Sequence, residues 1–524
     1  MLWSVASQDR RWLFAVAGAV LLAFFLNLGG YPLFDLDEGA FSQATLEMIA
    51  SGNYLSTTLD GAPRYDKPIF SYWMQALSVH LFGAQDFAFR LPSAIAASLW
   101  VFAVFLFVRA RAGAPAAGAA ALLIAFSVGP MVIGRSATAD AWLNLWLALT
   151  FIEIARWQEE QRRATLLRAY LWMGLGFLTK GPVAIAIPLL ASLLFFLSAG
   201  RGRDWLKAAF NPLGWLVLAA VTLPWYVLVF LREGSGFFYG FFIEHNLMRF
   251  TETREGHGGT PLYYLVALPL VLSPFIGWMI SALRRLAWRP SGLERLSWIW
   301  FGVVFLLVSA SSTQLPHYVL YGITPLIVIL ALHRERFTNV WLAFIPPLIV
   351  LALLVAMPEL LKIALMQVDR AYEVELGERG LEIFDFGYQL LMAAFLLAAI
   401  AVIVLFRAYP VWQRLLAIGA LQTAAIVLVF IPAAADMQQL PVKQAAELAR
   451  SLDRPVVAYR INMPTFSVYL GSPTERRMPE PGELAVTRSH AVAAVAEFHP
   501  EHPPIILYHS GGIVLLDVPA RSVP

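Results

Sequence analysis

The chain has 524 residues, of which 59% are hydrophobic and only 14% are charged, and its mean hydropathy is +0.66. Soluble proteins carry about 25% charged residues, so this composition excludes an ordinary soluble enzyme and indicates a chain that lies mostly in a lipid bilayer. A net charge of +3 is too small to suggest a nucleic-acid-binding protein. The absence of cysteine excludes disulfides and thiolate sites.

The first predicted element is a membrane helix over residues 12–30. Arg10 and Arg11 precede its apolar run, and no small-residue cleavage site follows the run, as one would in a signal peptide. We therefore expect an uncleaved helix whose N-terminus lies in the cytoplasm.

Apolar windows of roughly 20 residues, the length that crosses a bilayer, predict about thirteen membrane helices in all. The short pair on either side of Lys180-Gly181-Pro182 could also be one broken helix. After the first helix, the expected spans lie near residues 91–108, 114–133, 139–157, 167–179, 182–199, 211–231, 262–282, 296–311, 316–332, 338–357, 386–406 and 415–434.

Basic residues predict the orientation, because the cytoplasmic loops of membrane proteins are enriched in Lys and Arg. With the predicted spans, the basic clusters fall on one side, which we assign to the cytoplasm. The opposite side receives the long loops 31–90, 232–261 and 358–385 and everything after about residue 435. The clusters are Arg109 and Arg111, then Arg162, Arg163 and Arg168, then Arg201, Arg203 and Lys207, then Arg284, Arg285, Arg289 and Arg295, then Arg334 and Arg336, and finally Arg407 and Arg414.

The tail of the chain differs from the rest. It is more polar and rich in proline, with a helix-like stretch at 442–452 followed by three short strand-like runs between residues 455 and 516. This pattern predicts a small α/β domain outside the membrane. We therefore divide the chain into a transmembrane domain, residues 1–434, and an outer domain, residues 435–524.

The first outer loop, residues 31–90, is the segment richest in motifs. Asp37 and Glu38 directly precede a predicted amphipathic helix, residues 40–51, which we expect to lie in the plane of the membrane interface. The two acids either cap this helix or belong to a functional site. Later in the loop comes Tyr65-Asp66-Lys67-Pro68, whose lysine either snorkels to the interface or binds a phosphate as a point charge.

Three later segments also place ionisable residues on the outer side. Asp140 stands at the outer end of a predicted span, where a charge is costly and usually functional, unless it caps the helix. Lys180, at an outer turn, could pair with a carboxylate or bind an anion. His245 and Arg249 are four residues apart, on one face of a helix, and either face water or line a polar pocket.

These residues converge on one side of the membrane, in a topology derived from other residues. Acids, cations and aromatic side chains gathered there indicate a site for a charged, partly lipidic ligand. The converging residues are Asp37, Glu38, Asp66, Lys67, Asp140, Lys180, His245, Arg249 and His317.

At these motifs the chain resembles the bacterial aminoarabinose transferases and their relatives in the protein O-mannosyltransferase superfamily, from about residue 12 to 330. The resemblance implies the C-type glycosyltransferase fold, an all-α polytopic bundle of about thirteen transmembrane helices with interfacial helices and a small periplasmic α/β domain. It also implies a multi-pass protein of the bacterial inner membrane with a periplasmic active site. The motifs are Asp37-Glu38-Gly39, Tyr65 to Pro68, Tyr72-Trp73, Arg90 to Ala94, Arg135 to Asp140, Thr179 to Pro182, Phe241 to Phe250 and Leu315 to Tyr318.

The resemblance further implies a monomeric enzyme that transfers a sugar from a polyprenyl-phosphate donor, such as undecaprenyl phosphate, to lipid A, another lipid or glycan, or a protein. Asp37 is the implied general base, with Glu38 and Asp140 as further catalytic residues. The implied donor-phosphate-binding residues are Lys67, Arg249, Lys180, Tyr65 and Tyr318. The implied ligands of a divalent metal, zinc, are Asp66 and His245.

The chain departs from the family pattern at three positions. Ala40 stands where an arginine usually follows the acid pair, Asp66 replaces a glutamate, and Gln314 replaces a lysine. A phosphate contact of the family pattern is therefore missing from this chain or made by another residue. The identities of the sugar and the acceptor stay open.

Two other functions remain alternatives. A carrier or flippase for a lipid-linked sugar would carry polar residues near mid-membrane and paired, broken halves, and no internal repeat is evident here. A membrane scaffold that displays the tail domain would not require the gathered charges.

Overall fold

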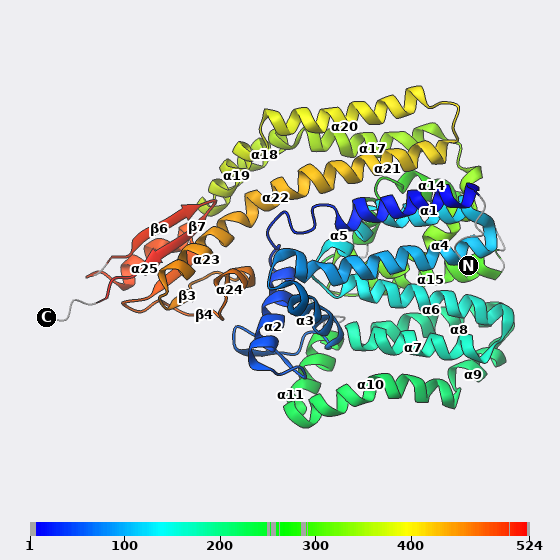
Figure 1. Ribbon diagram of the computed structural model, residues 1–524, viewed down its shortest axis with the longest axis horizontal. Helices are drawn as coiled ribbons and strands as arrows, with labels where there is room; N and C mark the ends of the chain where they lie inside the picture. Colours follow the sequence, from blue (N-terminus) through cyan, green and yellow to red (C-terminus); the bar gives the residue numbers. More distant parts are fainter. Residues whose placement is uncertain are drawn as a thin grey trace.

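The computed structural model describes residues 7–501 and 503–520 except for short gaps at 249–251, 253–257, 261, 285–289 and 291. Figure 1 shows long helices that run side by side, with the strands of the C-terminal part gathered at one end of the bundle. The helices of the bundle are α1 (Ser7–Val20), α4 (Asp86–Phe126), α5 (Val128–Arg135), α6 (Asp140–Glu160), α7 (Arg163–Lys180), α8 (Val183–Ser198), α9 (Gly202–Ala209), α10 (Pro212–Glu233), α13 (Tyr263–Val271), α14 (Ile276–Arg284), α15 (Gly292–Ser309), α16 (Ile323–Leu332), α17 (Val340–Val355), α20 (Phe386–Leu405), α21 (Val411–Ala425) and α22 (Ile431–Gln438).

Length and apolarity confirm a multi-pass membrane protein. Five of the described helical segments are long and apolar enough to cross a bilayer, or six if the bent pair of α17 and α18 (Met357–Leu365) is one span. The five are α4, α10, α15, α20 and the continuous segment Val411–Gln438. The larger count of about thirteen spans stays a prediction.

Helix α4 covers one predicted membrane span and most of the next one. Its 41 residues would extend about 60 Å at 1.5 Å per residue, twice the apolar thickness of a bilayer. The helix kinks at Gly113, whose φ of 76° is outside the helical region, between the spans predicted near 91–108 and 114–133. The second of these spans is also interrupted, because Ser127 is extended and separates α4 from α5.

The first outer loop folds into two helices and a hairpin, α2 (Asp37–Ser51), β1 (Thr57–Leu59), β2 (Ala62–Arg64) and α3 (Phe70–Phe82). Helix α2 confirms the predicted helix over 40–51, and it ends at Gly52 in a left-handed conformation, φ 66°. The predicted position of α2 in the membrane interface stays a prediction. Apolar and polar side chains of α2 are both buried, because α3 covers one side and α24 (Pro464–Leu470) covers another.

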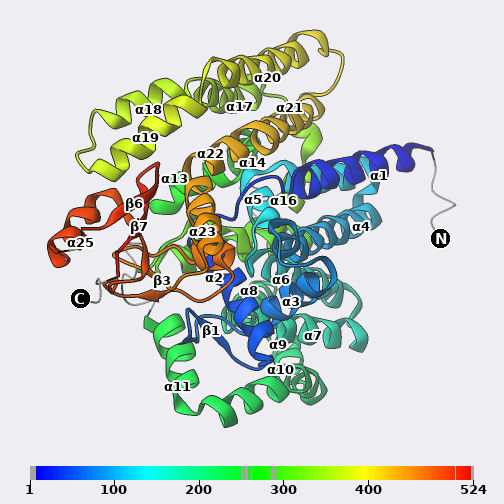
Figure 2. The same ribbon diagram turned by 60° about the vertical axis from the view of Figure 1, so that its left-hand side comes forward.

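The C-terminal unit, residues 440–520, contains a five-stranded sheet with the order β4-β3-β5-β7-β6. Its helices are α23 (Leu440–Leu452), α24 and α25 (Val492–Phe498), and its strands are β3 (Val456–Ala458), β4 (Glu475–Arg476), β5 (Leu484–Arg488), β6 (Ile505–Ser510) and β7 (Ile513–Asp517). Figure 2 shows β6 next to α19 (Ala371–Ile383), where Arg379 donates to Ser510. The division into two domains at residue 435 stays a prediction, and α22 continues to Gln438.

Candidate functional site

A cavity of about 170 Å³ lies where the first outer loop meets α7, α8, α15 and the 3-10 helix Pro316–Gly322. Five predicted site residues line it, although they come from four separate segments of the chain. The lining residues are Asp66, Lys67, Lys180, Val183, His245, Asn246, Leu307, Val308, Ser311, Thr313, Tyr318 and Tyr321.

One wall of the cavity carries a cluster around Asp66. Lys67 Nζ lies 2.5 Å from Asp66 Oδ1, and the guanidinium of Arg64 lies 2.9 Å from Oδ2. His245 Nδ1 is 3.3 Å from Oδ1. Arg64 also donates to the hydroxyl of Tyr72 at 3.2 Å. Two cations thus share one carboxylate, so this wall presents excess positive charge.

A second cluster surrounds Asp140. Lys180, the last residue of α7, places Nζ 2.5 Å from Asp140 Oδ1, while His317 Nε2 and the Tyr321 hydroxyl lie at 3.6 and 3.5 Å from the same oxygen. The ammonium of Lys180 also lies 5.5 Å from the ring centre of Tyr318, a cation–π distance. Asp140 is the first residue of α6, and within the described residues its carboxylate contacts Lys180, His317 and Tyr321.

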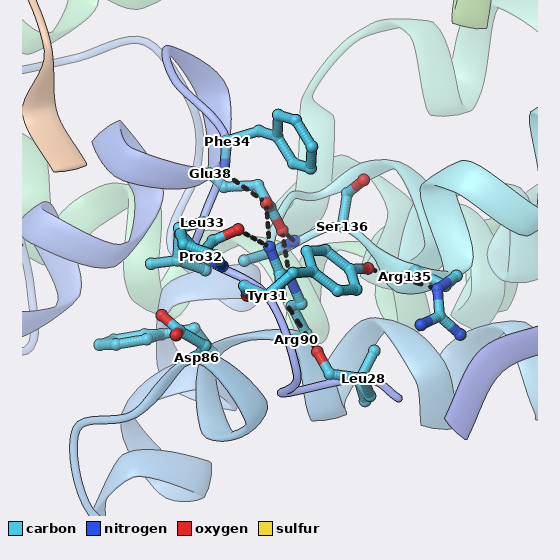
Figure 3. Close-up of polar contacts among 12 residues, drawn as sticks. Leu28, Tyr31, Pro32, Leu33, Phe34, Glu38, Asp86, Arg90, Arg135 and Ser136 are labelled. Carbon is cyan, nitrogen blue, oxygen red and sulfur yellow. Dashed lines mark hydrogen bonds and ion pairs between the residues drawn. The ribbon is translucent and has the colours of Figure 1, made fainter. Parts of the chain in front are cut away.

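Glu38 is buried and is not among the residues that line the cavity. Arg90 forms a bidentate pair with it, with both N···O distances at 2.8 Å. Arg90 also donates to three backbone carbonyls in residues 28–32 (Figure 3). Glu38 in turn accepts from the amides of Phe34 and Ala137. The pair therefore fixes the segment that leads into α2 against α4.

Asp37, one residue earlier, is exposed. Within the described residues it makes no hydrogen bond or ion pair, and its charge lies within electrostatic reach of Arg64, Tyr72 and His317. Asp37 is thus a carboxylate at the edge of both clusters with free oxygen lone pairs.

One predicted residue, Tyr65, is placed differently from expectation. Tyr65 does not line the cavity, because its hydroxyl donates to Glu233 at 2.9 Å and its ring packs edge-on against Phe237. Burial raises the pKa of Tyr65 to about 12, so the hydroxyl stays a donor. Arg249 lies outside the described residues. The helix that carries His245 is a π-helix, Tyr239–Leu247.

The residues at Asp66 do not fit the predicted zinc site. Structural and catalytic zinc take three or four protein ligands, and the described residues hold no group of three or more His, Asp or Glu side chains suited to a metal. Both carboxylate oxygens of Asp66 already contact cations, Arg64 and Lys67. A dication there would be repelled by both.

Arg64 and Tyr321 are site residues that the sequence analysis did not single out. A signal for Arg64 was present, because a basic residue on the outer side of a membrane protein is unusual under the positive-inside rule. Tyr321 had none, because one tyrosine in an apolar helix resembles a core residue.

The chain is similar to known proteins in sequence and in fold. Residues 66–228 match the model of the dolichyl-phosphate-mannose-protein mannosyltransferase family. The crystal structure of ArnT from Cupriavidus metallidurans bound to undecaprenyl phosphate superposes with a TM-score of 0.78 at 21% identity, covering 96% of this chain and 97% of that one. The apo form gives 0.80 at 20% identity, with coverage of 97% and 98%. The chain has the fold of these two ArnT structures.

Curated relatives match over a shorter stretch. The undecaprenyl phosphate-α-4-amino-4-deoxy-L-arabinose arabinosyl transferase of Edwardsiella ictaluri is 30% identical over 336 residues, 62% of this chain and 60% of the relative. The transferase of the same description from Aeromonas salmonicida is 30% identical over 355 residues, 64% of either chain. The chain thus spans somewhat less than two thirds of the relatives it matches. The resemblance found at the sequence motifs is confirmed.

Proposed function

We propose that this protein is a glycosyltransferase that takes a sugar from a polyprenyl-phosphate donor, with undecaprenyl phosphate as carrier, and transfers it to an acceptor at the outer membrane face. The observation that carries the proposal is the pair of lysines, Lys67 and Lys180, that line one cavity next to the exposed Asp37. Lipid A, another lipid or glycan, or a protein can serve as acceptor. The names of the relatives favour 4-amino-4-deoxy-L-arabinose as the sugar.

The chemistry assigns Asp37 as the general base. Its carboxylate takes the proton of the acceptor hydroxyl, the acceptor oxygen bonds to the anomeric carbon, and the bond from that carbon to the phosphate oxygen breaks. The electron pair leaves with polyprenyl phosphate, whose charge increases from one to about two negative units. A base that already held a cation would be less basic, so the free lone pairs of Asp37 suit this role.

The donor phosphate binds between the two clusters. Lys67 and Lys180 stabilise the negative charge that develops on the leaving group, which is where electrostatic catalysis is most effective. The hydroxyl of Tyr318, which also lines the cavity, adds a neutral donor. Phosphate would share each ammonium with its carboxylate partner, Asp66 or Asp140.

Glu38 and Asp140 are positioning residues in this proposal, in place of the catalytic roles that the resemblance implied. Glu38 is engaged by Arg90 and two amides, which leaves it no capacity to take a proton. Asp140 orients Lys180. No step is assigned to zinc.

We also propose that the cavity and the C-terminal unit face the periplasm and that the N-terminus faces the cytoplasm. The positions of the basic loops support this orientation. The cavity and the C-terminal unit contact the same outer loop, since Asp66 comes from it and Thr465 binds Asp35 in it.

The variant Lys67→Met tests the donor-phosphate site. We expect its affinity for undecaprenyl phosphate to fall about tenfold or more, because a hydrogen bond to a charged group contributes roughly 1.5–3 kcal/mol. Asp66 keeps Arg64 as its partner, so the protein should stay folded. The measurement is a binding titration of the detergent-solubilised full chain with undecaprenyl phosphate.

The matched control is Lys207→Met, which removes an exposed lysine on α9, at the end of the bundle opposite the strands (Figure 1). Its affinity should equal that of the wild type. Equal affinities for Lys67→Met and wild type would contradict the assignment of this cavity to the donor phosphate.

A further inference from the structure

We propose that Thr465, in α24 of the C-terminal unit, is a positioning residue that fixes the start of α2 and thereby the carboxylate of Asp37. The inference rests on the proposed function, because it concerns the base of that reaction. It gives the C-terminal unit an indirect part in catalysis, although none of its described residues lines the cavity.

The central contact joins Thr465 to Asp35. The backbone amide of Thr465 donates to Asp35 Oδ1 at 3.0 Å, and its hydroxyl donates to Oδ2. Both oxygens of Asp35 are therefore held by one residue that lies 430 positions later in the chain. Asp35 is two residues before Asp37, so this contact constrains the backbone that carries the base.

Gly39 supplies an independent observation on the other side of Asp37. A Cβ atom at Gly39 would lie 2.6 Å from the backbone nitrogen of Thr465 and 2.6 Å from Asp35 Oδ1. Real Cβ atoms essentially never come so close. Helix α24 thus touches the first turn of α2 without room for a single added carbon, which is a close fit of backbone on backbone.

Two further carboxylates of the outer loop and α4 hold the C-terminal unit in place. Asp60 accepts from Ser467 at 2.8 Å and from Arg476 at 3.2 Å. Asp86 accepts from the Tyr469 hydroxyl at 2.8 Å. Asp35, Asp60 and Asp86 therefore each accept hydrogen bonds from the C-terminal unit. These contacts fix the orientation in which α24 docks.

Two contacts therefore fix the backbone on either side of Asp37. Arg90 holds Glu38 from inside the bundle, and Thr465 holds Asp35 from outside it. Asp37 stands between these anchors and is itself without a hydrogen bond among the described residues. Its position is thus set by its neighbours, and a shift of about 1 Å in a catalytic group can cost roughly a hundredfold in rate.

Electrostatics agrees with this role of Thr465. Burial raises the pKa of the Asp35 carboxyl to about 7, while the two hydrogen bonds from Thr465 lower it. Removing the hydroxyl removes one of the interactions that favour the charged carboxylate, so the contact loosens.

The variant Thr465→Val, which keeps the shape but removes the hydroxyl, tests the inference. We expect sugar transfer to be about ten- to a hundredfold slower, with an unchanged Kd for undecaprenyl phosphate. Hydrogen exchange of the amides in residues 33–41 should become faster. Transfer is measured by mass spectrometry in membranes of the host that lack the chromosomal copy and hold the native donor and acceptor; binding and exchange use the purified full chain.

A variant that keeps the hydroxyl at position 465 separates a positioning role of Thr465 from a mere packing effect. Thr465→Ser keeps the hydroxyl and should restore most of the rate, whereas Gly39→Ala should slow transfer as Thr465→Val does. The control Gly18→Ala adds the same atom to α1 where nothing lies within 4 Å, and it should transfer sugar at the wild-type rate.

The outcomes are distinct. A full rate for Thr465→Val, a loss of undecaprenyl phosphate binding, or a loss that Thr465→Ser does not restore would overturn the inference. If Asp37→Asn is inactive while Thr465→Val is fully active, only the positioning role fails. If Asp37→Asn transfers as well as wild type, the proposed function itself fails.

Discussion

Replacing Asp37 with asparagine should abolish sugar transfer while the protein still binds its lipid carrier. The amide cannot accept the proton of the acceptor hydroxyl, and general-base catalysis contributes roughly 10²- to 10⁴-fold to a rate. The loss should appear in the transfer rate alone, because Asp37 holds no cavity residue in place within the described part of the chain. The measurement compares the transfer rate with the Kd for undecaprenyl phosphate in wild type and variant.

Asp453→Asn is the matched control for this prediction. Asp453 is an exposed aspartate in the left-handed conformation after α23, a position that asparagine tolerates. The variant Asp453→Asn should keep the wild-type transfer rate and the wild-type affinity for undecaprenyl phosphate. A transfer rate of Asp37→Asn within about threefold of wild type would contradict the role of Asp37 as base.

The second large effect concerns stability, at the pair of Arg90 and Glu38. We expect Arg90→Met to lower the free energy of unfolding by about 3–5 kcal/mol, because it leaves a buried carboxylate without its partner. The guanidinium of Arg90 is fully buried and also holds three carbonyls. Thermal unfolding of the detergent-solubilised protein measures the effect.

Two companions of Arg90→Met make this prediction specific. The double variant Arg90→Met, Glu38→Gln should recover part of the loss, since no charge is then left buried. Arg111→Met breaks a more exposed pair with Glu159, 2.6 Å apart, and should cost at most about 1 kcal/mol. Equal losses of unfolding free energy for Arg90→Met and Arg111→Met would show that the buried pair of Arg90 and Glu38 does not anchor the first outer loop.

The features that the sequence predicts correctly depend on local or periodic signals. The helix over 40–51 follows from an apolar stripe and Gly52, and α2 ends there. The gathering of Lys67, Lys180 and His245 follows from the membrane itself, because assigning loops to one side brings distant segments to one surface. The cavity joins these three residues.

The features that the sequence does not predict depend on tertiary contacts. Nothing near Asp35 indicates that Thr465 binds it, since 430 residues separate them. The buried position of α2 follows from that docking. Glu38 illustrates the same limit, because a glutamate next to the proposed base Asp37 looks functional until Arg90, 52 residues later, is seen to hold it.

Sugar transfer is tested most directly by mass spectrometry of lipid A, total lipids, outer glycans and envelope proteins from cells that carry either wild-type protein or Asp37→Asn at equal expression. We expect a sugar that is attached to an acceptor only in the wild-type cells, and its detection would identify the sugar and the acceptor. Identical lipids, glycans and envelope proteins in the two strains would contradict this expectation and would favour a carrier of lipid-linked sugar.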